Sequence, residues 1–451
     1  MKIQKQVPLT EGPILKSLTG LAVPIMISSF LGTLYNITDM AWIGLLGSKA
    51  VAAVGVGGMY VWLSQGLASL ARMGGQVHVA QCLGRGDKEQ AHRYAKTAVQ
   101  LSILLGLAFA AVSLLFTDSL VGFFKLEGVK TILDAKIYMR ITCGLILFSF
   151  LNLTLTGLYT AQGDSKTPFV ANFIGLLINL LLDPLLILGV GPFPRIEVAG
   201  AAVATVSAQL VVMLVMMVGV FRSKKEENVL KGIRLFEPFS KEELGNICKI
   251  GGPTAIQGMV YCMISMVLTR MVAAFGAEAI ATQRVGGQIE SVSWNTADGF
   301  AAALNAFVGQ NYGAKKMDRV QKGYRISFWT VAIWGALIML AFIIFPGPIA
   351  GVFFHEEKAM EIAISYLIII GFSEAFMCVE LMTIGALSGL GKTKLCSVIS
   401  ITATSMRIPL AMVLSRTSLG LDGIWWALTL TSVAKGIIFY LTFRYQMREK
   451  C

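Results

Sequence analysis

Twelve apolar segments follow one another along the chain, and each is long enough to cross a lipid bilayer as a helix. A spanning helix needs about 20 mostly apolar residues, and a backbone in lipid can satisfy its polar groups only within helices or closed barrels. The pattern predicts an all-α integral membrane protein with twelve transmembrane helices. The segments cover residues 17–45, 51–82, 95–117, 137–160, 168–190, 198–221, 251–275, 280–311, 324–350, 361–388, 395–415 and 423–444.

Composition excludes most soluble functions. Hydrophobic residues make up 55% of the 451 residues and charged residues only 14%, whereas soluble domains carry about 25% charged residues. The net charge of +12 does not indicate nucleic-acid binding, because the basic residues are scattered between apolar segments. The seven cysteines show no metal-ligand spacing, and the common hydrolase, zinc-protease and phosphate-loop motifs do not occur. We expect no enzyme and no cofactor beyond a coupling ion.

Basic residues are concentrated in alternate connections between the segments. They gather at both ends of the chain and near 85–96, 222–249, 315–325 and 392–394. Because cytoplasmic connections of membrane proteins carry the excess of Lys and Arg, this pattern predicts an even number of spans with both termini cytoplasmic. Short connections and the lack of a targeting sequence favour a prokaryotic plasma membrane.

The chain also repeats itself. Pro24 and Pro253 are 229 positions apart (253 − 24), as are Gln81 and Gln310, and several glycines keep the same or nearly the same spacing. The sequence therefore predicts an N-terminal six-helix lobe (1–221), a cytoplasmic linker (222–249) and a C-terminal six-helix lobe (250–451). Six spans per repeat make the two repeats parallel, an arrangement typical of alternating-access transporters.

Asp39 is the first charge placed inside an apolar segment. It shares a helical face with Ser28, Gly32, Tyr35 and Asn36. An intramembrane acid costs about 2.5–3.5 kcal/mol on insertion scales and usually has a function. The alternative is an acid that extends toward the membrane surface from a helix end.

The fifth segment carries a second polar stripe. Asn179 and Asp183 share one helical face, and Pro184 follows directly. The proline removes a backbone hydrogen bond to Leu180, so a carbonyl oxygen is freed beside the acid. Carboxylate and carbonyl oxygens suit a small hard cation. The alternative is a proline kink with a polar companion.

These acids are not imposed by the repeat. Asp39 aligns with Leu268, while Asn179 and Asp183 align with Arg407 and Ala411. The acidic pair thus belongs to the N-terminal half alone and is interpreted as a coupling-ion site, because Na⁺ or a proton could relieve the repulsion between two buried carboxylates.

With these motifs, the chain resembles the MATE family, the multidrug and toxic compound extrusion transporters. The resemblance rests on VPIMISSFLGTLYNITDMAWIGLLG, GLYTAQGDSKTPF, NLLLDPLLILG, VAGAAVATVSAQL, VGQNYGAKK, GALSGLGKTK and RIPLAMVLS, in this order. It implies V-shaped lobes and antiport of drug-like, often cationic or amphipathic compounds against Na⁺ or H⁺. It also implies a cation site, with Na⁺ as its metal if the coupling ion is Na⁺, made of Asp39, Asn179, Asp183 and Thr205. Some relatives carry a Glu where this chain has Tyr261.

The C-terminal half keeps several charges in its apolar segments. They are Glu290, Asp298, Glu374, Glu380, Arg407 and Lys435. Two roles remain open for them: structural pairs between Arg407 or Lys435 and a glutamate, or a second site for cationic substrate and protons. Tyr35, Asn36, Glu290 and Glu374 are the candidate substrate-binding residues.

Two other functions fit the sequence less well. A lipid-linked saccharide flippase of related fold would need a strongly cationic cleft, which the acidic N-terminal half argues against. An intramembrane prenyltransferase would need several acids in one short loop, and no such loop occurs. The expected partners are drug-like small molecules and the lipid bilayer, with the protein acting as a monomer.

Overall fold

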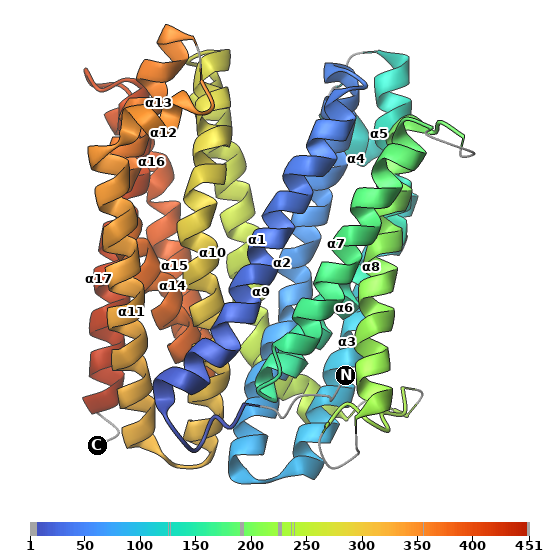
Figure 1. Ribbon diagram of the computed structural model, residues 1–451, viewed down its shortest axis with the longest axis vertical. Helices are drawn as coiled ribbons and strands as arrows, with labels where there is room; N and C mark the ends of the chain where they lie inside the picture. Colours follow the sequence, from blue (N-terminus) through green and yellow to red (C-terminus); the bar gives the residue numbers. More distant parts are fainter. Residues whose placement is uncertain are drawn as a thin grey trace. The chain divides into compact units, whose positions relative to one another are not determined.

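The computed structural model describes residues 7–124, 126, 128–189, 194–223, 228–235, 237–238, 240–354 and 356–448, and these residues form helices without any strand. The first half contains α1 (Ile14–Gly44), α2 (Ser48–Arg85), α3 (Lys88–Leu115), α4 (Thr117–Gly122), α5 (Val129–Gly144), α6 (Leu147–Ala161), α7 (Lys166–Ile187) and α8 (Glu197–Arg222) (Figure 1). The second half contains α9 (Lys241–Ala273), α10 (Ala277–Gly313), α11 (Met317–Ile344), α12 (Pro346–Gly351), α13 (Glu357–Gly371), α14 (Glu374–Gly389), α15 (Thr393–Ser405), α16 (Arg407–Leu414) and α17 (Leu421–Arg448).

The helices confirm an all-α membrane fold. Among the described residues, 9 helical segments are long and apolar enough to cross a membrane, and the total is 11 if two bent pairs each count as one span. These pairs are α5–α6, bent by 43°, and α13–α14, bent by 50°. Helix α10, 37 residues long, is more polar and completes the twelve segments expected from the sequence.

The internal repeat is visible in the helix boundaries. Helix α3 spans 88–115 and α11 spans 317–344, so both ends are 229 positions apart. The short helices α4 and α12 keep the same spacing, and the bent pair α5–α6 recurs as α13–α14. Packing repeats as well, because α2 packs on α6 while α10 packs on α14.

The chain folds into two compact units. Unit 1 comprises residues 1–7 and 27–258, and unit 2 comprises residues 8–26 and 259–451. Helices α1 and α9 therefore each contribute to both units, whereas the sequence placed the lobe boundary in the linker 222–249. The two termini and linker residues 224–227, 236 and 239 lie outside the described residues.

Close helix contacts explain why α1 and α9 divide in this way. In unit 1, a Cβ at Gly251 of α9 would collide with the backbone of Leu70 on α2. In unit 2, a Cβ at Gly299 of α10 would collide with Met26 of α1 and approach the Ala22 carbonyl oxygen. These are equivalent contacts, because Leu70 and Gly299 are 229 positions apart, as are Ala22 and Gly251. The first part of each repeat's first helix thus packs on the second helix of the other repeat.

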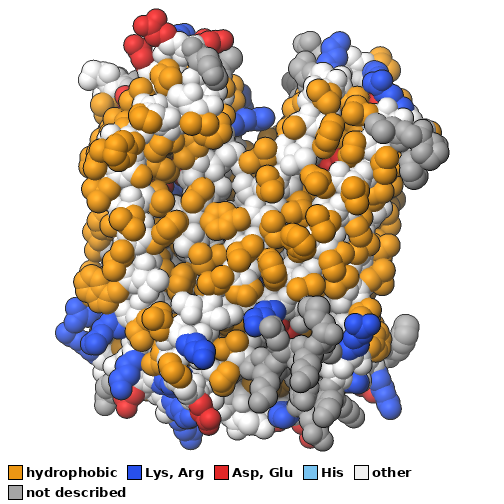
Figure 2. Space-filling view, viewed as in Figure 1, with side chains coloured by type: hydrophobic (Ala, Val, Ile, Leu, Met, Phe, Trp, Pro, Cys, Tyr) orange, Lys and Arg blue, Asp and Glu red, His pale blue; other side chains and the backbone are white. Residues whose placement is uncertain are grey.

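Apolar side chains cover much of the outer surface. In Figure 2 they spread over the middle of the visible face, while charged side chains lie mainly toward its two ends. Exposed examples include Leu181, Phe221 and Trp329. Such a surface is stable in contact with lipid chains, and it agrees with helices that span a membrane.

Candidate functional site

Helices α1, α7 and α8 bring the four predicted cation-site residues together within unit 1. Asp39, Asn179 and Asp183 are buried, with 7%, 1% and 0% of their surface exposed, and Thr205 is half-buried. The two carboxylates lie close enough to interact electrostatically. Residues from three helices therefore form one polar cluster in an apolar lobe.

The hydrogen bonds leave part of this cluster incomplete. Asn179 donates from Nδ2 to Asp183 Oδ1 at 3.3 Å, and Tyr35 donates from Oη to Thr205 Oγ1 at 2.9 Å. Asp39 Oδ1 and Asp183 Oδ2 are buried and have no hydrogen-bond partner. A buried carboxylate oxygen without a partner costs free energy, and a bound cation or proton would relieve that cost at both atoms.

Small residues set the geometry of the cluster. A Cβ at Gly200 of α8 would lie 2.6 Å from the carbonyl oxygen of Leu186 on α7. A Cβ at Gly175 of α7 would collide with Val212 of α8. Glycine at both positions lets the two helices approach closely, and the Tyr35 hydroxyl links Thr205 of α8 to α1.

Tyr138 of α5 is a neighbour that the sequence analysis missed. It is buried and interacts electrostatically with both Asp39 and Asp183. Its ring packs on α2 at Gly57, where a Cβ would collide with it. The repeat carried a signal for this contact: Gly286 packs in the same way on Tyr366, and both the glycines and the tyrosines are separated by 228 or 229 positions.

The potential ligand atoms of the cluster are oxygens, and two of the side chains that supply them are acids. Carboxylate, amide and hydroxyl oxygens bind hard cations such as Na⁺, and the same carboxylates can carry protons. The part of the chain that the structure describes contains no group of three or more His, Cys, Asp or Glu that could hold a metal ion.

Two of the predicted substrate-binding residues flank this cluster. Tyr35 is half-buried and Asn36 is exposed, one helical position further along α1. Glu290 and Glu374 lie in unit 2, so the four predicted substrate-binding residues do not form one cluster within a unit.

Unit 2 has its own buried acidic cluster around Tyr366. Tyr366 donates a hydrogen bond from Oη to Glu290 Oε1. Glu290 also interacts with Arg407, which donates to Thr431 at 3.0 Å and to Ser432 at 2.9 Å. Glu374 is fully buried near Glu290, and neither of its carboxylate oxygens has a hydrogen-bond partner.

A complete ion pair lies nearby. Lys435 of α17 donates to Glu380 Oε1 of α14 at 2.7 Å, and both side chains are 6% exposed. Of the two roles that the sequence left open for these charges, a structural pair fits Lys435 and Glu380. Glu374 differs, because its buried oxygens remain unpartnered.

The fold and the buried acidic cluster define a polytopic membrane transporter. The MatE family model matches residues 24–185 and 253–413, and the two matches begin 229 positions apart, as the repeat does. The chain therefore belongs to the MatE family, whose members are transporters and not enzymes.

Curated and solved relatives cover nearly the whole chain. The probable multidrug resistance protein NorM of Thermotoga maritima is 29% identical over 98% of this chain and 95% of its own length. A FAD transporter of Shewanella oneidensis is 25% identical over 96% of this chain and 95% of its own. The solved outward-facing structure of a multidrug resistance MATE family transporter aligns with a TM-score of 0.89 at 25% identity, covering 100% of this chain and 99% of that one.

Proposed function

We propose that this protein is a secondary antiporter that exports drug-like, often cationic or amphipathic compounds in exchange for Na⁺ or H⁺. Family membership supports transport, and the relatives named as multidrug resistance proteins support this class of cargo. The observation that carries the coupling is the pair of buried, unpartnered carboxylate oxygens on Asp39 and Asp183.

In the proposed mechanism, the coupling ion completes the cluster in unit 1. With the site empty, Asp39 and Asp183 repel each other in an apolar environment. A proton neutralises one carboxylate, whereas Na⁺ binds the free oxygens with help from Asn179 and Thr205. Either ion relieves the repulsion and changes how α1 packs against α7 and α8. An ion moving inward draws about 2.3 kcal/mol per elementary charge per 100 mV of membrane potential.

The proposed setting is a prokaryotic plasma membrane with both termini on the cytoplasmic side and a monomer as the working unit. The concentration of Lys and Arg in alternate connections supports this orientation.

Proteoliposome transport tests the proposal. Export of a fluorescent lipophilic cation is measured under a Na⁺ gradient and, separately, a pH gradient. Wild-type protein should export the dye under at least one gradient, and Asp39→Asn should abolish that export. Asp118→Asn is the matched control, because Asp118 is an acid of the same half whose side chain is 72% exposed and paired with Lys136.

The outcomes separate the parts of the proposal. If wild-type protein exports no cation under either gradient, drug export is wrong for this chain, and FAD is the next cargo to assay because one relative is named a FAD transporter. If Asp39→Asn exports as well as wild type, the coupling site lies elsewhere.

A further inference from the structure

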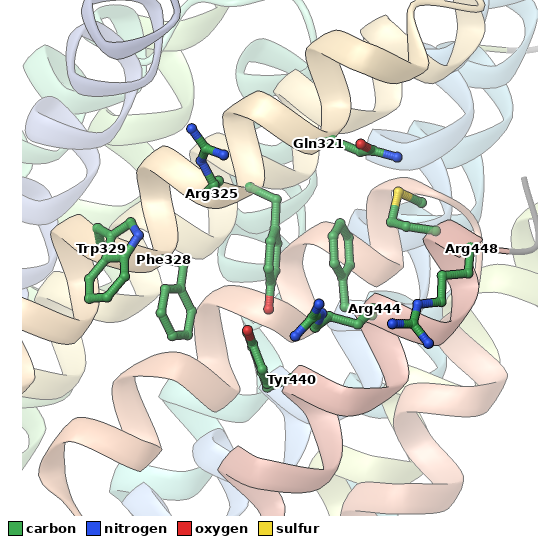
Figure 3. Close-up of a pocket in the computed structure, with 10 residues that line it drawn as sticks. Gln321, Arg325, Phe328, Trp329, Tyr440, Arg444 and Arg448 are labelled. Carbon is green, nitrogen blue, oxygen red and sulfur yellow. The ribbon is translucent and has the colours of Figure 1, made fainter. Parts of the chain in front are cut away.

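A basic and aromatic groove lies between α11 and α17 in unit 2. It has a volume of about 520 Å³ and is lined by Gln321, Tyr324, Arg325, Phe328, Trp329, Tyr440, Phe443, Arg444, Met447 and Arg448. Figure 3 shows side chains from the two helices meeting across it. Small-molecule sites usually measure about 300–1,000 Å³, so the groove is large enough for a ligand.

The floor of the groove is aromatic. Tyr324 stacks on Phe443 with ring centroids 3.6 Å apart, and Phe328 packs on Tyr440 at 5.1 Å. The Tyr324 hydroxyl is 3.0 Å from Thr383 Oγ1 on α14, which fixes the ring from behind. Trp329 is 60% exposed at the rim. These rings are suited to contact with hydrocarbon.

Arginines from both helices make the groove basic (Figure 3). Arg325, Arg444 and Arg448 are all exposed, and no described Asp or Glu forms an ion pair with any of them. Arg444 and Arg448 end α17, and Arg325 lies near the start of α11, so the charges gather at the helix ends proposed to be cytoplasmic. In membrane proteins, arginine at such helix ends commonly reaches the lipid phosphates, and aromatic residues are enriched at headgroup depth.

The repeat shows what fills the equivalent position in unit 1. The α3 counterparts of Gln321, Arg325 and Trp329, 229 positions earlier, are His92, Lys96 and Gln100. All three bind the linker: His92 to Val229 O at 2.7 Å, Lys96 to the Glu237 carboxylate at 2.8 Å, and Gln100 to the carbonyl oxygens of Leu235 and Glu237. Val229 and Leu230 add buried apolar side chains.

The occupant in unit 1 therefore combines a negative charge with apolar groups. In unit 2, the groove is lined only by α11 and α17 among the described residues. A free ligand with the same two properties, an anionic head beside a hydrocarbon chain, matches the three arginines and the aromatic floor.

We propose that the α11–α17 groove binds an anionic phospholipid of the cytoplasmic leaflet, with its phosphate on Arg325 and Arg444 and an acyl chain on the aromatic floor. Basic pockets between membrane helices on the cytoplasmic side are suited to such headgroups. This site is separate from the antiport proposal, because it uses none of the residues of either acidic cluster.

Native mass spectrometry of the full chain in mild detergent tests the site. Phosphatidylglycerol and phosphatidylcholine are titrated separately into wild type, Arg325→Gln/Arg444→Gln and Lys322→Gln. Each basic residue near an anionic surface contributes about fivefold to binding, so the double variant should bind phosphatidylglycerol at least about tenfold more weakly, with phosphatidylcholine unchanged. Lys322→Gln is the matched control, because Lys322 is exposed on α11 but does not line the groove.

A charge-conserving variant and two soluble competitors complete the experiment. The variant Arg325→Lys/Arg444→Lys keeps both positive charges and should bind phosphatidylglycerol within about threefold of wild type. This variant separates the effect of lost charge from misfolding, and gel filtration checks the fold of each variant. Inorganic phosphate and glycerol 3-phosphate should not displace the lipid. The proposal is overturned if the double glutamine variant binds phosphatidylglycerol like wild type, if Lys322→Gln loses as much, or if free phosphate competes equally.

Discussion

Two kinds of buried charge occur at the residue scale. Lys435 and Glu380 satisfy each other at 2.7 Å, whereas Asp39, Asp183 and Glu374 keep buried oxygens without partners. An unpartnered buried polar atom costs about 1–3 kcal/mol, and more for a charged group. A carboxylate that is already paired gains no stabilisation by binding a cation, whereas a carboxylate with an unpartnered oxygen does. This difference separates a structural ion pair from groups that can exchange ions.

The hydroxyl of Thr205 provides the first test. Thr205→Val removes an oxygen that accepts from Tyr35 at 2.9 Å while keeping the side-chain shape. Loss of one uncharged ligand or hydrogen bond corresponds to about 1 kcal/mol. The apparent affinity for the coupling ion, measured in proteoliposomes, should therefore fall roughly five- to tenfold. Thr205→Ser keeps the hydroxyl and should stay close to wild type. Thr160→Val is the control, because that buried hydroxyl bonds to Thr156 O in its own helix. Unchanged ion dependence would remove Thr205 from the site.

The Lys435–Glu380 pair provides a test of structural charge. Removing one partner of a buried ion pair costs about 3–5 kcal/mol, whereas replacing both with apolar residues is often nearly neutral. We expect Lys435→Met and Glu380→Leu each to lower the unfolding free energy strongly and the double variant to recover most of the loss, as measured by denaturation in detergent. Losses that simply add would show that the two side chains do not act as a pair.

The polar stripes of α1 and α7 made much of the candidate cluster predictable. Helical spacing put Tyr35 with Asp39 and Asn179 with Asp183, and the family resemblance added Thr205. Their role in ion binding stays a prediction. Tyr138 could not be found in this way, because its place beside the acids depends on contacts between helices far apart in sequence. The partners of Glu290 and Lys435 depended on such contacts too.

At the scale of elements, each half packs a tyrosine against its second helix and beside buried acids. Gly57 of α2 leaves room for Tyr138, and Gly286 of α10 leaves room for Tyr366. Around these matched tyrosines the acids differ: Asp39 and Asp183 in one half, Glu290 and Glu374 in the other. The shared scaffold therefore fixes the aromatic ring, and each half adds its own polar chemistry.

Gly57→Ala should disturb both packing and coupling. The added methyl group would collide with the Tyr138 ring, and overpacking of a tight core typically costs about 1–3 kcal/mol. A displaced ring would also alter the surroundings of Asp39 and Asp183, so coupled export should fall by more than the stability loss explains. Gly58→Ala is a close control, because nothing lies within 4 Å of the Cβ it adds. Equal effects of the two variants on export would argue against a role for the ring.

The bent pairs α5–α6 and α13–α14 were predicted as single segments. The hydropathy pattern shows one continuous apolar segment in each case. In the structure, the helix breaks between Gly144 and Leu147 and between Gly371 and Glu374. No proline marks either turn. The glycines that end α5 and α13 are weak signals in a chain with 46 glycines, so only the recurrence of the break in both halves distinguishes them.

At the scale of the whole molecule, the repeat was readable from sequence but the packing partners were not. A fixed offset shows that two segments are equivalent; it does not show which copy each segment packs on. The contacts at Gly251 and Gly299 place the first parts of α9 and α1 with the second helix of the opposite repeat. For this reason the compact units divide within α1 and α9.

The parallel arrangement that the sequence predicts for the repeats can be tested on the whole molecule. Glu89 and Asp318 are equivalent exposed positions 229 apart, and Lys130 and Lys358 are equivalent exposed positions 228 apart. If the repeats are parallel, each equivalent pair lies on one side of the membrane. Because Lys and Arg gather near the first pair, Glu89 and Asp318 should be cytoplasmic and Lys130 and Lys358 external.

Single cysteines at these four positions test the arrangement. The background is Cys248→Ala/Cys451→Ser, because the other five cysteines are buried. A membrane-impermeant maleimide should label Lys130→Cys and Lys358→Cys in intact spheroplasts, and Glu89→Cys and Asp318→Cys only after permeabilisation. Labelling that differs within an equivalent pair would indicate inverted repeats, because inversion puts equivalent residues on opposite sides. If the labelling agrees within both pairs but on the opposite sides, the repeats are parallel and the basic connections are external. The lipid proposed for the α11–α17 groove would then belong to the other leaflet.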